Sequence, residues 1–267
     1  MAPTLKKQEA EAQAEALTLE LRDVSLAFGE KTILDGLSLK VPKGHKLSIV
    51  GESSCGKSTL LKVMVGLIRP DKGQVILFGK DTSSIGTREL ERLRRRVGMQ
   101  FQAGALFDSM SVGENLLLAS MESVRGAKGG KPASAEGIGA MLGKVGLGKA
   151  AAQNPSSLSG GMRKRAAIAR ALIVSPELAI FDEPTAGLDP ITSSAMIRLL
   201  NGLSADLGAA MLLATTDVDV ARRFSEDIII LNKGRIVARG AVGSLLASTD
   251  PYISNFLKRY ARVAVAH

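Results

Sequence analysis

The sequence contains no tryptophan, only 3% aromatic residues and a single cysteine, Cys55. Proteins that bind single-stranded nucleic acid stack bases on aromatic side chains, so we expect no nucleic-acid partner. One cysteine cannot form an internal disulfide, which is consistent with a reducing compartment. The sequence has no run of 18 or more apolar residues and no apolar core near its start. We therefore expect neither a membrane-spanning helix nor a secretion signal.

What is present is ordinary for a folded protein: 267 residues, 45% of them hydrophobic, with a net charge of +9. This length predicts one or two domains with a packed core. The positive charge favours an anionic partner such as a nucleotide or an anionic membrane face, although a solvated basic surface would look the same. Residues 1–16 are polar and rich in Ala and Glu, and we expect a flexible tail there.

The first part of the chain alternates between strand and helix patterns. Residues 17–41 alternate apolar and polar residues, which predicts antiparallel strands with one buried face. A short apolar strand follows at 46–50, a helix at 58–67 and another strand at 74–79. Residues 90–96 form a basic helical stretch.

The middle and the end of the chain differ in pattern. Residues 103–175 show no strand pattern, and we expect a helical subdomain there. Apolar runs at 178–181 and 211–215 are typical of buried parallel strands. Residues 228–238 predict a hairpin whose turn contains Gly234, a residue free to adopt positive φ. The expected fold class is therefore α/β.

The strongest motif is GESSCGKST at residues 51–59, which follows an expected strand and opens an expected helix. Its spacing is that of a phosphate-binding loop, in which main-chain amides and the helix start surround an anion. We expect Lys57 to reach the β- and γ-phosphates of a nucleotide, and Ser58 to bind Mg²⁺. A chance glycine-rich turn is the alternative, and the flanking strand and helix argue against it. The nucleotide-binding residues of this loop are expected to be Gly51, Ser53, Ser54, Cys55, Gly56, Lys57, Ser58 and Thr59.

Two positions in this loop are unusual. Ser54 occupies a variable position often filled by glycine, so its side chain must point away from the phosphates. Cys55 has two interpretations: a thiol whose pKa is lowered by the loop amides, or a small side chain that fits a tight loop. We favour the second.

The second motif is LAIFDEP at residues 178–184, in which two carboxylates follow a buried strand. Ligands of open α/β sheets bind at the carboxyl ends of the strands. We expect Asp182 to hold Mg²⁺ through water and Glu183 to polarise the attacking water. The alternative is that the two acids only cap a helix. The presence of a phosphate-binding loop in the same chain argues against this alternative.

The third motif is LSGGMRKR at residues 158–165, in which Ser159, Gly160 and Gly161 precede a helix. This is a second helix start suited to an anion. One ATP does not need two such sites from a single chain. Two chains arranged head to tail do need them, because each could supply its third motif to the other's nucleotide.

These three motifs in this order resemble the ABC transporter ATPase family over residues 17–240. The resemblance implies a P-loop ATPase with a mixed core sheet, an N-terminal antiparallel β subdomain and an α-helical signature subdomain at about 103–175. Residues 241–267 would be a C-terminal extension. The resemblance further implies ATP and Mg²⁺ as cofactors, hydrolysis coupled to transport, a homodimer, and integral membrane permease subunits as partners.

Smaller elements of the family can also be placed. Phe28 matches the aromatic residue that stacks on adenine, although a core phenylalanine is the alternative. Gln102 matches the glutamine that senses Mg²⁺ and the membrane subunit. Asp189 matches the loop that crosses the dimer interface.

One family element is missing. The family has a histidine after its last core strand, and the matching position here is Thr216 within ATTDVD; His45 and His267 lie elsewhere in the sequence. Loss of one preorganised donor can lower a rate by about 10²–10³. We therefore expect that Thr216 makes hydrolysis slow, that it acts through a water, or that Glu183 suffices. A slow nucleotide-switched binding module is the matching alternative function.

Three segments resemble the ATPases of Mce/Mla-type phospholipid transporters. They are the signature LSGGMRKR, the stretch FQAGALFDSMSVGEN and the segment DPYISNFL. This resemblance implies phospholipid as cargo, an Mce-type lipid-binding protein as a further partner, and a peripheral position on the cytoplasmic face of the inner membrane. The alternative is the ATPase of a small-solute importer for amino acids or ions. A soluble ABC protein acting on ribosomes or DNA is disfavoured, because the chain has one cassette and no room for a long coiled coil.

Overall fold

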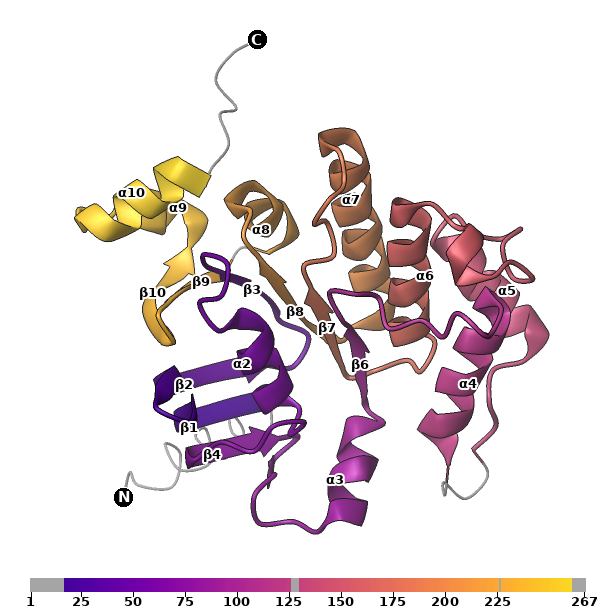
Figure 1. Cartoon of the computed structure of the whole chain (residues 1–267), viewed down its shortest axis with the longest axis horizontal. Helices are drawn as coiled ribbons and strands as arrows, with labels where there is room; N and C mark the ends of the chain where they lie inside the picture. Colours follow the sequence, from indigo (N-terminus) through magenta and orange to yellow (C-terminus); the bar gives the residue numbers. More distant parts are fainter. Residues whose placement is uncertain (1–16, 126–129, 226, 261–267) are drawn as a thin grey trace, which may run out of the picture.

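The computed structural model describes residues 17–125, 130–225 and 227–260, which form two β-sheets with helices packed between and beside them (Figure 1). The predicted tail at 1–16 and the end of the predicted extension, 261–267, lie outside the described residues. The first sheet is antiparallel, with strand order β2-β1-β4-β5. Its strands are β1 (Leu17–Phe28), β2 (Lys31–Pro42), β4 (Lys72–Leu77) and β5 (Lys80–Asp81). The antiparallel strands predicted from alternation are thus confirmed.

The second sheet has six strands in the order β10-β9-β3-β8-β7-β6. Neighbouring strands from β9 to β6 are parallel, and β10 is an antiparallel edge strand. The predicted mixed core sheet is therefore confirmed. Its strands are β3 (Lys46–Val50), β6 (Val97–Gln100), β7 (Leu178–Asp182), β8 (Ala210–Thr215), β9 (Asp227–Asn232) and β10 (Arg235–Ala241).

The core sheet is apolar on both faces, as its continuous apolar runs predict. Side chains alternate between the faces, so in β7 Leu178 and Ile180 pack toward the antiparallel sheet, and Ala179 and Phe181 pack toward the opposite helices. Helix α2 (Lys57–Met64) contributes to the first of these layers and lies between the two sheets (Figure 1).

The other helices pack on the opposite face of the sheet, at its edges or on one another. Helix α6 (Gly160–Leu172) contacts β6 and β7 as well as α4 and α5, so it joins the predicted helical part to the core. In the described part of the chain, no helix is long and apolar enough to cross a membrane. The further helices are α3 (Thr87–Arg94), α4 (Val112–Val124), α5 (Ala135–Lys144), the 3₁₀ helix η1 (Pro155–Ser157), α7 (Pro190–Leu207), α8 (Val218–Phe224), α9 (Val242–Leu246) and α10 (Pro251–Tyr260).

Strand β6 is absent from our prediction, which placed no element between residues 96 and 103. It has only four residues and includes Gly98, which weakens any strand pattern. The structure shows why glycine stands there: a Cβ at Gly98 would lie 2.0 Å from the carbonyl oxygen of Ala171 in α6. The close approach of α6 to β6 thus explains why position 98 is glycine, the residue that weakened the strand pattern in the sequence.

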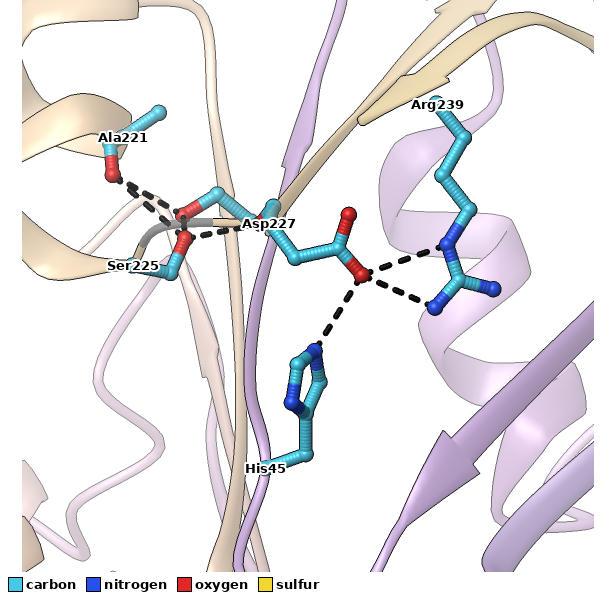
Figure 2. A network of polar contacts seen from close by, with 6 residues as sticks. His45, Ala221, Ser225, Asp227 and Arg239 are labelled. Atoms are coloured by element: carbon cyan, nitrogen blue, oxygen red, sulfur yellow. Dashed lines mark hydrogen bonds and ion pairs between the residues drawn. The ribbon is translucent and has the colours of Figure 1, made fainter. Parts of the chain in front are cut away.

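A polar network joins the hairpin β9–β10 to the start of β3 (Figure 2). The Asp227 carboxylate accepts from the Arg239 guanidinium at 2.8 Å and lies 3.1 Å from His45 Nε2. Nearby, the Ser48 and Ser225 hydroxyls lie 2.7 Å apart. These contacts fix the register of the predicted hairpin against the strand that leads to the phosphate loop.

Candidate nucleotide site

The phosphate loop connects β3 to α2, as its motif predicts. It turns sharply, with left-handed φ values of 64° at Ser54 and 110° at Gly56. A Cβ at Gly51 would lie 2.4 Å from the Leu231 carbonyl oxygen, so this position excludes any side chain. Gly56 is the N-cap of α2 and provides no side-chain cap. The loop therefore has the geometry that presents helix-start amides to an anion.

The side chains of the phosphate loop differ in how far they are exposed to solvent. Ser53 and Ser54 are both exposed. Cys55 is buried, and burial raises the pKa of its thiol against the opposing effect of Lys57. The direction of this shift disfavours a reactive thiolate. The Cys55 carbonyl accepts from the Gly234 amide at 3.1 Å, which ties the hairpin turn to the loop.

Lys57 is buried and its ammonium lies over the loop. Its Nζ donates to the carbonyls of Gly51 at 2.9 Å and Glu52 at 3.0 Å. The same atom lies 3.6 Å from Glu183 Oε1. The structure thus brings the first and second motifs together around one ammonium group.

Asp182 ends β7 and is buried beside the loop. Burial raises the pKa of its carboxyl, while a hydrogen bond from the Ser58 hydroxyl and the charge of Lys57 oppose that rise. Its Oδ1 has no hydrogen-bond partner among the described residues. Buried carboxylate oxygens are costly without a partner, so this oxygen is suited to a bound cation or its water.

The chemistry of these donors fits Mg²⁺. A hydroxyl and a carboxylate are hard oxygen ligands, and Mg²⁺ in nucleotide sites uses one or two protein ligands with phosphate oxygens and water. Among the described residues, no group of three or more His, Cys, Asp or Glu side chains gathers as a metal site. The ion would therefore depend on the nucleotide for the rest of its ligands.

Glu183 directly follows β7 and adopts a left-handed φ of 49°. Its amide donates to the Ala214 carbonyl in β8 at 2.9 Å. Burial raises the pKa of the Glu183 carboxyl; the charge of Lys57, the amide of Thr216 and the hydroxyl of Thr215 lower it. The end of β8 therefore positions this carboxylate.

Thr216 contacts Glu183 in a way that the sequence could not show. Its main-chain amide acts on the Glu183 carboxylate as a hydrogen-bond donor and lowers the pKa of that carboxyl. The neighbouring Thr215 contributes its side chain, and our sequence prediction did not include it. The available signal was a hydroxyl residue buried at the end of an apolar strand.

Gln102 is exposed in the turn after β6, and among the described residues no hydrogen bond joins its side chain to the carboxylates. Gln100, which the sequence analysis did not single out, is buried instead. Its amide nitrogen lies 3.4 Å from the main-chain oxygen of Asp182, and its Oε1 has no hydrogen-bond partner in the described part of the chain. Phe28 lies at the end of β1 and is 56% exposed, which removes the alternative of a core phenylalanine.

The third motif and Asp189 both lie at helix starts. The Ser159 hydroxyl caps α6 by accepting from the Met162 amide at 3.3 Å, and Ser159 and Gly160 are exposed. Asp189 caps α7 by accepting from two amides at 3.0 Å each, and these hydrogen bonds lower the pKa of its carboxyl. In the sheet order, α6 packs at the β6 edge and α2 follows β3, with β8 and β7 between them (Figure 1). The two helix starts that the sequence predicts to bind anions thus belong to different parts of the molecule.

A family model described as ABC transporter matches residues 34–186, which is more than half of the chain. The chain belongs to the ABC transporter ATPase family. The match contains all three motifs, and it ends before Asp189 and Thr216. Family membership shows an ATP-binding subunit that hydrolyses ATP, as the sequence predicted.

Relatives of this ABC ATPase serve different transporters. The intermembrane phospholipid transport ATP-binding protein MlaF of Escherichia coli is 37% identical over 92% of this chain and 90% of its own length. The methionine import ATP-binding protein MetN of Rhizobium johnstonii is 38% identical over 93% of this chain and 68% of its own length. The Arabidopsis thaliana protein TRIGALACTOSYLDIACYLGLYCEROL 3, chloroplastic, is 39% identical over 89% of this chain and 72% of its own length.

Solved structures confirm the fold of the ABC ATPase. A dimeric ATP-binding cassette bound to ADP and Pi superposes with a TM-score of 0.76 and 32% identity, over 84% of this chain and 98% of that one. A nucleotide-free cassette superposes with a TM-score of 0.75 and 27% identity, over 90% of this chain and 98% of that one.

The main-chain contact of Thr216 leads to a prediction for this ATPase. Thr216→Ala keeps the amide that reaches Glu183 and so removes no donor to that carboxylate. We therefore expect kcat to change by less than about threefold, whereas loss of a preorganised donor costs about 10²–10³. Thr216→His should raise kcat if the loop can direct the imidazole to the γ-phosphate, with little change in ATP affinity. Steady-state phosphate release by both variants and the wild type tests this. A loss of 30-fold or more in Thr216→Ala would assign the catalytic donor to the side chain.

Proposed function

We propose that this ABC ATPase is the energy-supplying subunit of a phospholipid transporter, working as a homodimer with integral membrane permease subunits and an Mce-type lipid-binding protein. The observation that supports this most is the similarity to MlaF along 92% of the chain and 90% of that relative. The basic signature LSGGMRKR and the stretch FQAGALFDSMSVGEN point to the same subfamily. In this proposal the subunit lies on the cytoplasmic face of the inner membrane, attached through the permease.

The proposed chemistry uses the residues gathered at the end of β3 and β7. Lys57 would move from the loop carbonyls to the β- and γ-phosphates, because its ammonium is attracted more strongly to charged phosphate oxygens than to carbonyl oxygens. Ser58 and Asp182 would hold Mg²⁺, and Gln102 would join them when the turn after β6 moves. When bound, the ion neutralises charge that develops on the phosphates. Glu183 would orient the attacking water and accept its proton.

The proposed dimer supplies the remaining contacts. Ser159, Gly160 and Gly161 of a second copy would close on the γ-phosphate, and Asp189 would cross the interface. The exposure of the α6 start and its separation from α2 support this arrangement. Phe28, which is 56% exposed, would stack on adenine.

A small-solute importer is the second candidate, supported by the 38% identity to MetN. The relatives with 37% and 38% identity serve a phospholipid and a methionine transporter, so identity alone does not choose between these cargoes. The proposal of phospholipid depends on the signature and the loop after β6. Proteins that copurify with the chain from membranes separate the two candidates, since a lipid system would bring an Mce-type protein and an importer would not.

The permease is proposed to dock beside the turn that follows β6. Phe107 in this segment is 47% exposed, and Met121 on α4 is 50% exposed. Between α3, β6, α4 and α6 lies a cavity of about 670 Å³ whose lining includes Arg94, Arg125 and Arg170. Apolar side chains beside a concave surface are suited to receive a helix of a membrane subunit.

A crosslinker at Ala105 or Phe107 should therefore capture an integral membrane protein in native membranes. Val237, which is 40% exposed on the edge strand β10, provides the control position and should capture far less of it. Mass spectrometry of the adducts identifies the partner. Capture of ribosomal or DNA-repair proteins at Ala105 would contradict the transporter proposal, and capture of a solute permease would favour the second candidate.

A further inference from the structure

Lys164 lies in the first turns of α6, just after the signature residues. Its ammonium does not extend into solvent but donates to the main-chain oxygen of Glu183 at 3.0 Å. The side chain is half-buried, and burial lowers the pKa of Lys164 while the charge of Glu183 opposes that shift. A lysine ammonium that is partly removed from water loses solvation free energy, and no full ion pair among the described residues replaces it here. A lysine on the surface does not lose this free energy.

Its two basic neighbours have other partners. Arg163 donates to the Leu158 carbonyl at 2.7 Å, and Arg165 donates to the Val145 carbonyl at 3.2 Å. Both of those acceptors lie in the helical part of the chain. Of the three consecutive basic residues, Lys164 is therefore the one that connects α6 to the end of β7.

The acceptor is a residue whose main chain needs support. Glu183 has a Cβ and yet adopts φ of 49°, a conformation that costs free energy unless its surroundings fix it. Its amide is held by the Ala214 carbonyl at 2.9 Å. Its own carbonyl accepts from the Ala186 amide at 3.2 Å and from Lys164. The direction of the carboxylate depends on both peptide groups, so a donor at either one acts on the carboxylate.

We propose that Lys164 is a positioning residue for hydrolysis. It holds the main chain of Glu183, so that a movement of α6 also moves the Glu183 carboxylate. Closure of a second chain's nucleotide on Ser159 would then be transmitted along α6 to the carboxylate that serves this chain's own nucleotide. The inference rests on the proposed role of Glu183. It assigns no contact between Lys164 and ATP.

Three substitutions test the contact. Lys164→Met removes the donor and keeps a long side chain, so kcat should fall about tenfold, because small displacements of a catalytic group are costly. The KM for ATP should stay within about twofold and Tm within a few degrees, since the proposed role of Lys164 is one hydrogen bond to the Glu183 main chain and not a contact with ATP. Lys164→Gln and Lys164→Arg keep a donor and should recover at least half of the lost activity. Lys149→Met, an exposed lysine in the same helical part, is the control and should match the wild type.

A second measurement separates positioning from a folding defect. With hydrolysis slowed and closure intact, the Lys164→Met dimer formed in ATP should persist longer than the wild-type dimer in size-exclusion chromatography. Three results would each overturn the proposal: a wild-type kcat in Lys164→Met, a fall in its kcat accompanied by a fall in Tm of more than a few degrees, or no recovery of kcat in Lys164→Gln and Lys164→Arg. Glu183→Gln is measured alongside: if it remains active, the proposed role of Glu183 fails, whereas an inactive Glu183→Gln beside an active Lys164→Met overturns the inference alone.

Discussion

Replacing Glu183 with Gln is expected to lower ATP turnover by about 10²–10⁴, the range typical of lost general-base assistance. The amide has the same size and can still accept from the Thr216 amide, so the local structure should persist. It cannot accept a proton from the attacking water. ATP affinity should change little, and the closed dimer should accumulate in ATP. Phosphate release and size-exclusion chromatography measure the two effects.

The control for this substitution is Glu136→Gln, which neutralises an exposed carboxylate on α5. It should hydrolyse ATP at the wild-type rate, since it lies outside the site. Near wild-type turnover by Glu183→Gln would remove Glu183 from the role of general base. Asp182, whose buried Oδ1 has no hydrogen-bond partner among the described residues, would then be the remaining carboxylate of the site.

Lys57→Met should weaken ATP binding by about 10- to 150-fold, because hydrogen bonds to charged groups contribute about 1.5–3 kcal/mol. In the structure its ammonium is shared between two loop carbonyls and Glu183, and all three are weaker partners than a polyphosphate. The substitution also removes the charge that opposes the raised pKa of Glu183, so the pKa of that carboxyl should rise further. Binding of a fluorescent ATP analogue measures the affinity.

Lys72→Met, on the exposed end of β4, removes an equal charge far from the motif and serves as the control. Its ATP affinity should equal that of the wild type. An unchanged affinity in Lys57→Met would mean that loop amides alone bind the phosphates. The phosphate loop would then be an anion site without its lysine.

Most of the nucleotide site could be predicted because its parts are contiguous in sequence. The loop at 51–59 needs only neighbouring residues to form its turn, and the carboxylates at 182 and 183 follow directly from an apolar run. Alternation predicted the antiparallel sheet for the same reason, since one pleated strand displays its buried face every second residue.

The contacts that could not be predicted join residues far apart in the chain. The Gln100 amide approaches Asp182 from the neighbouring strand, and the Lys164 side chain reaches Glu183 from another layer. The Thr216 contact uses a main-chain amide, which every residue except proline possesses, so residue type gives no signal. Strand β6 was missed because close packing against α6 requires glycine at position 98, the residue that weakens a strand pattern.

Transport of lipid by the intact complex tests the proposed function most directly. The chain, with the membrane proteins that copurify with it, would be reconstituted in vesicles containing a fluorescent phospholipid, and ATP-dependent transfer of that lipid would be followed. We expect transfer that requires ATP and is lost in Glu183→Gln, with no uptake of methionine by the same vesicles. Methionine uptake without lipid transfer, or a complex with no integral membrane subunit, would contradict the proposal.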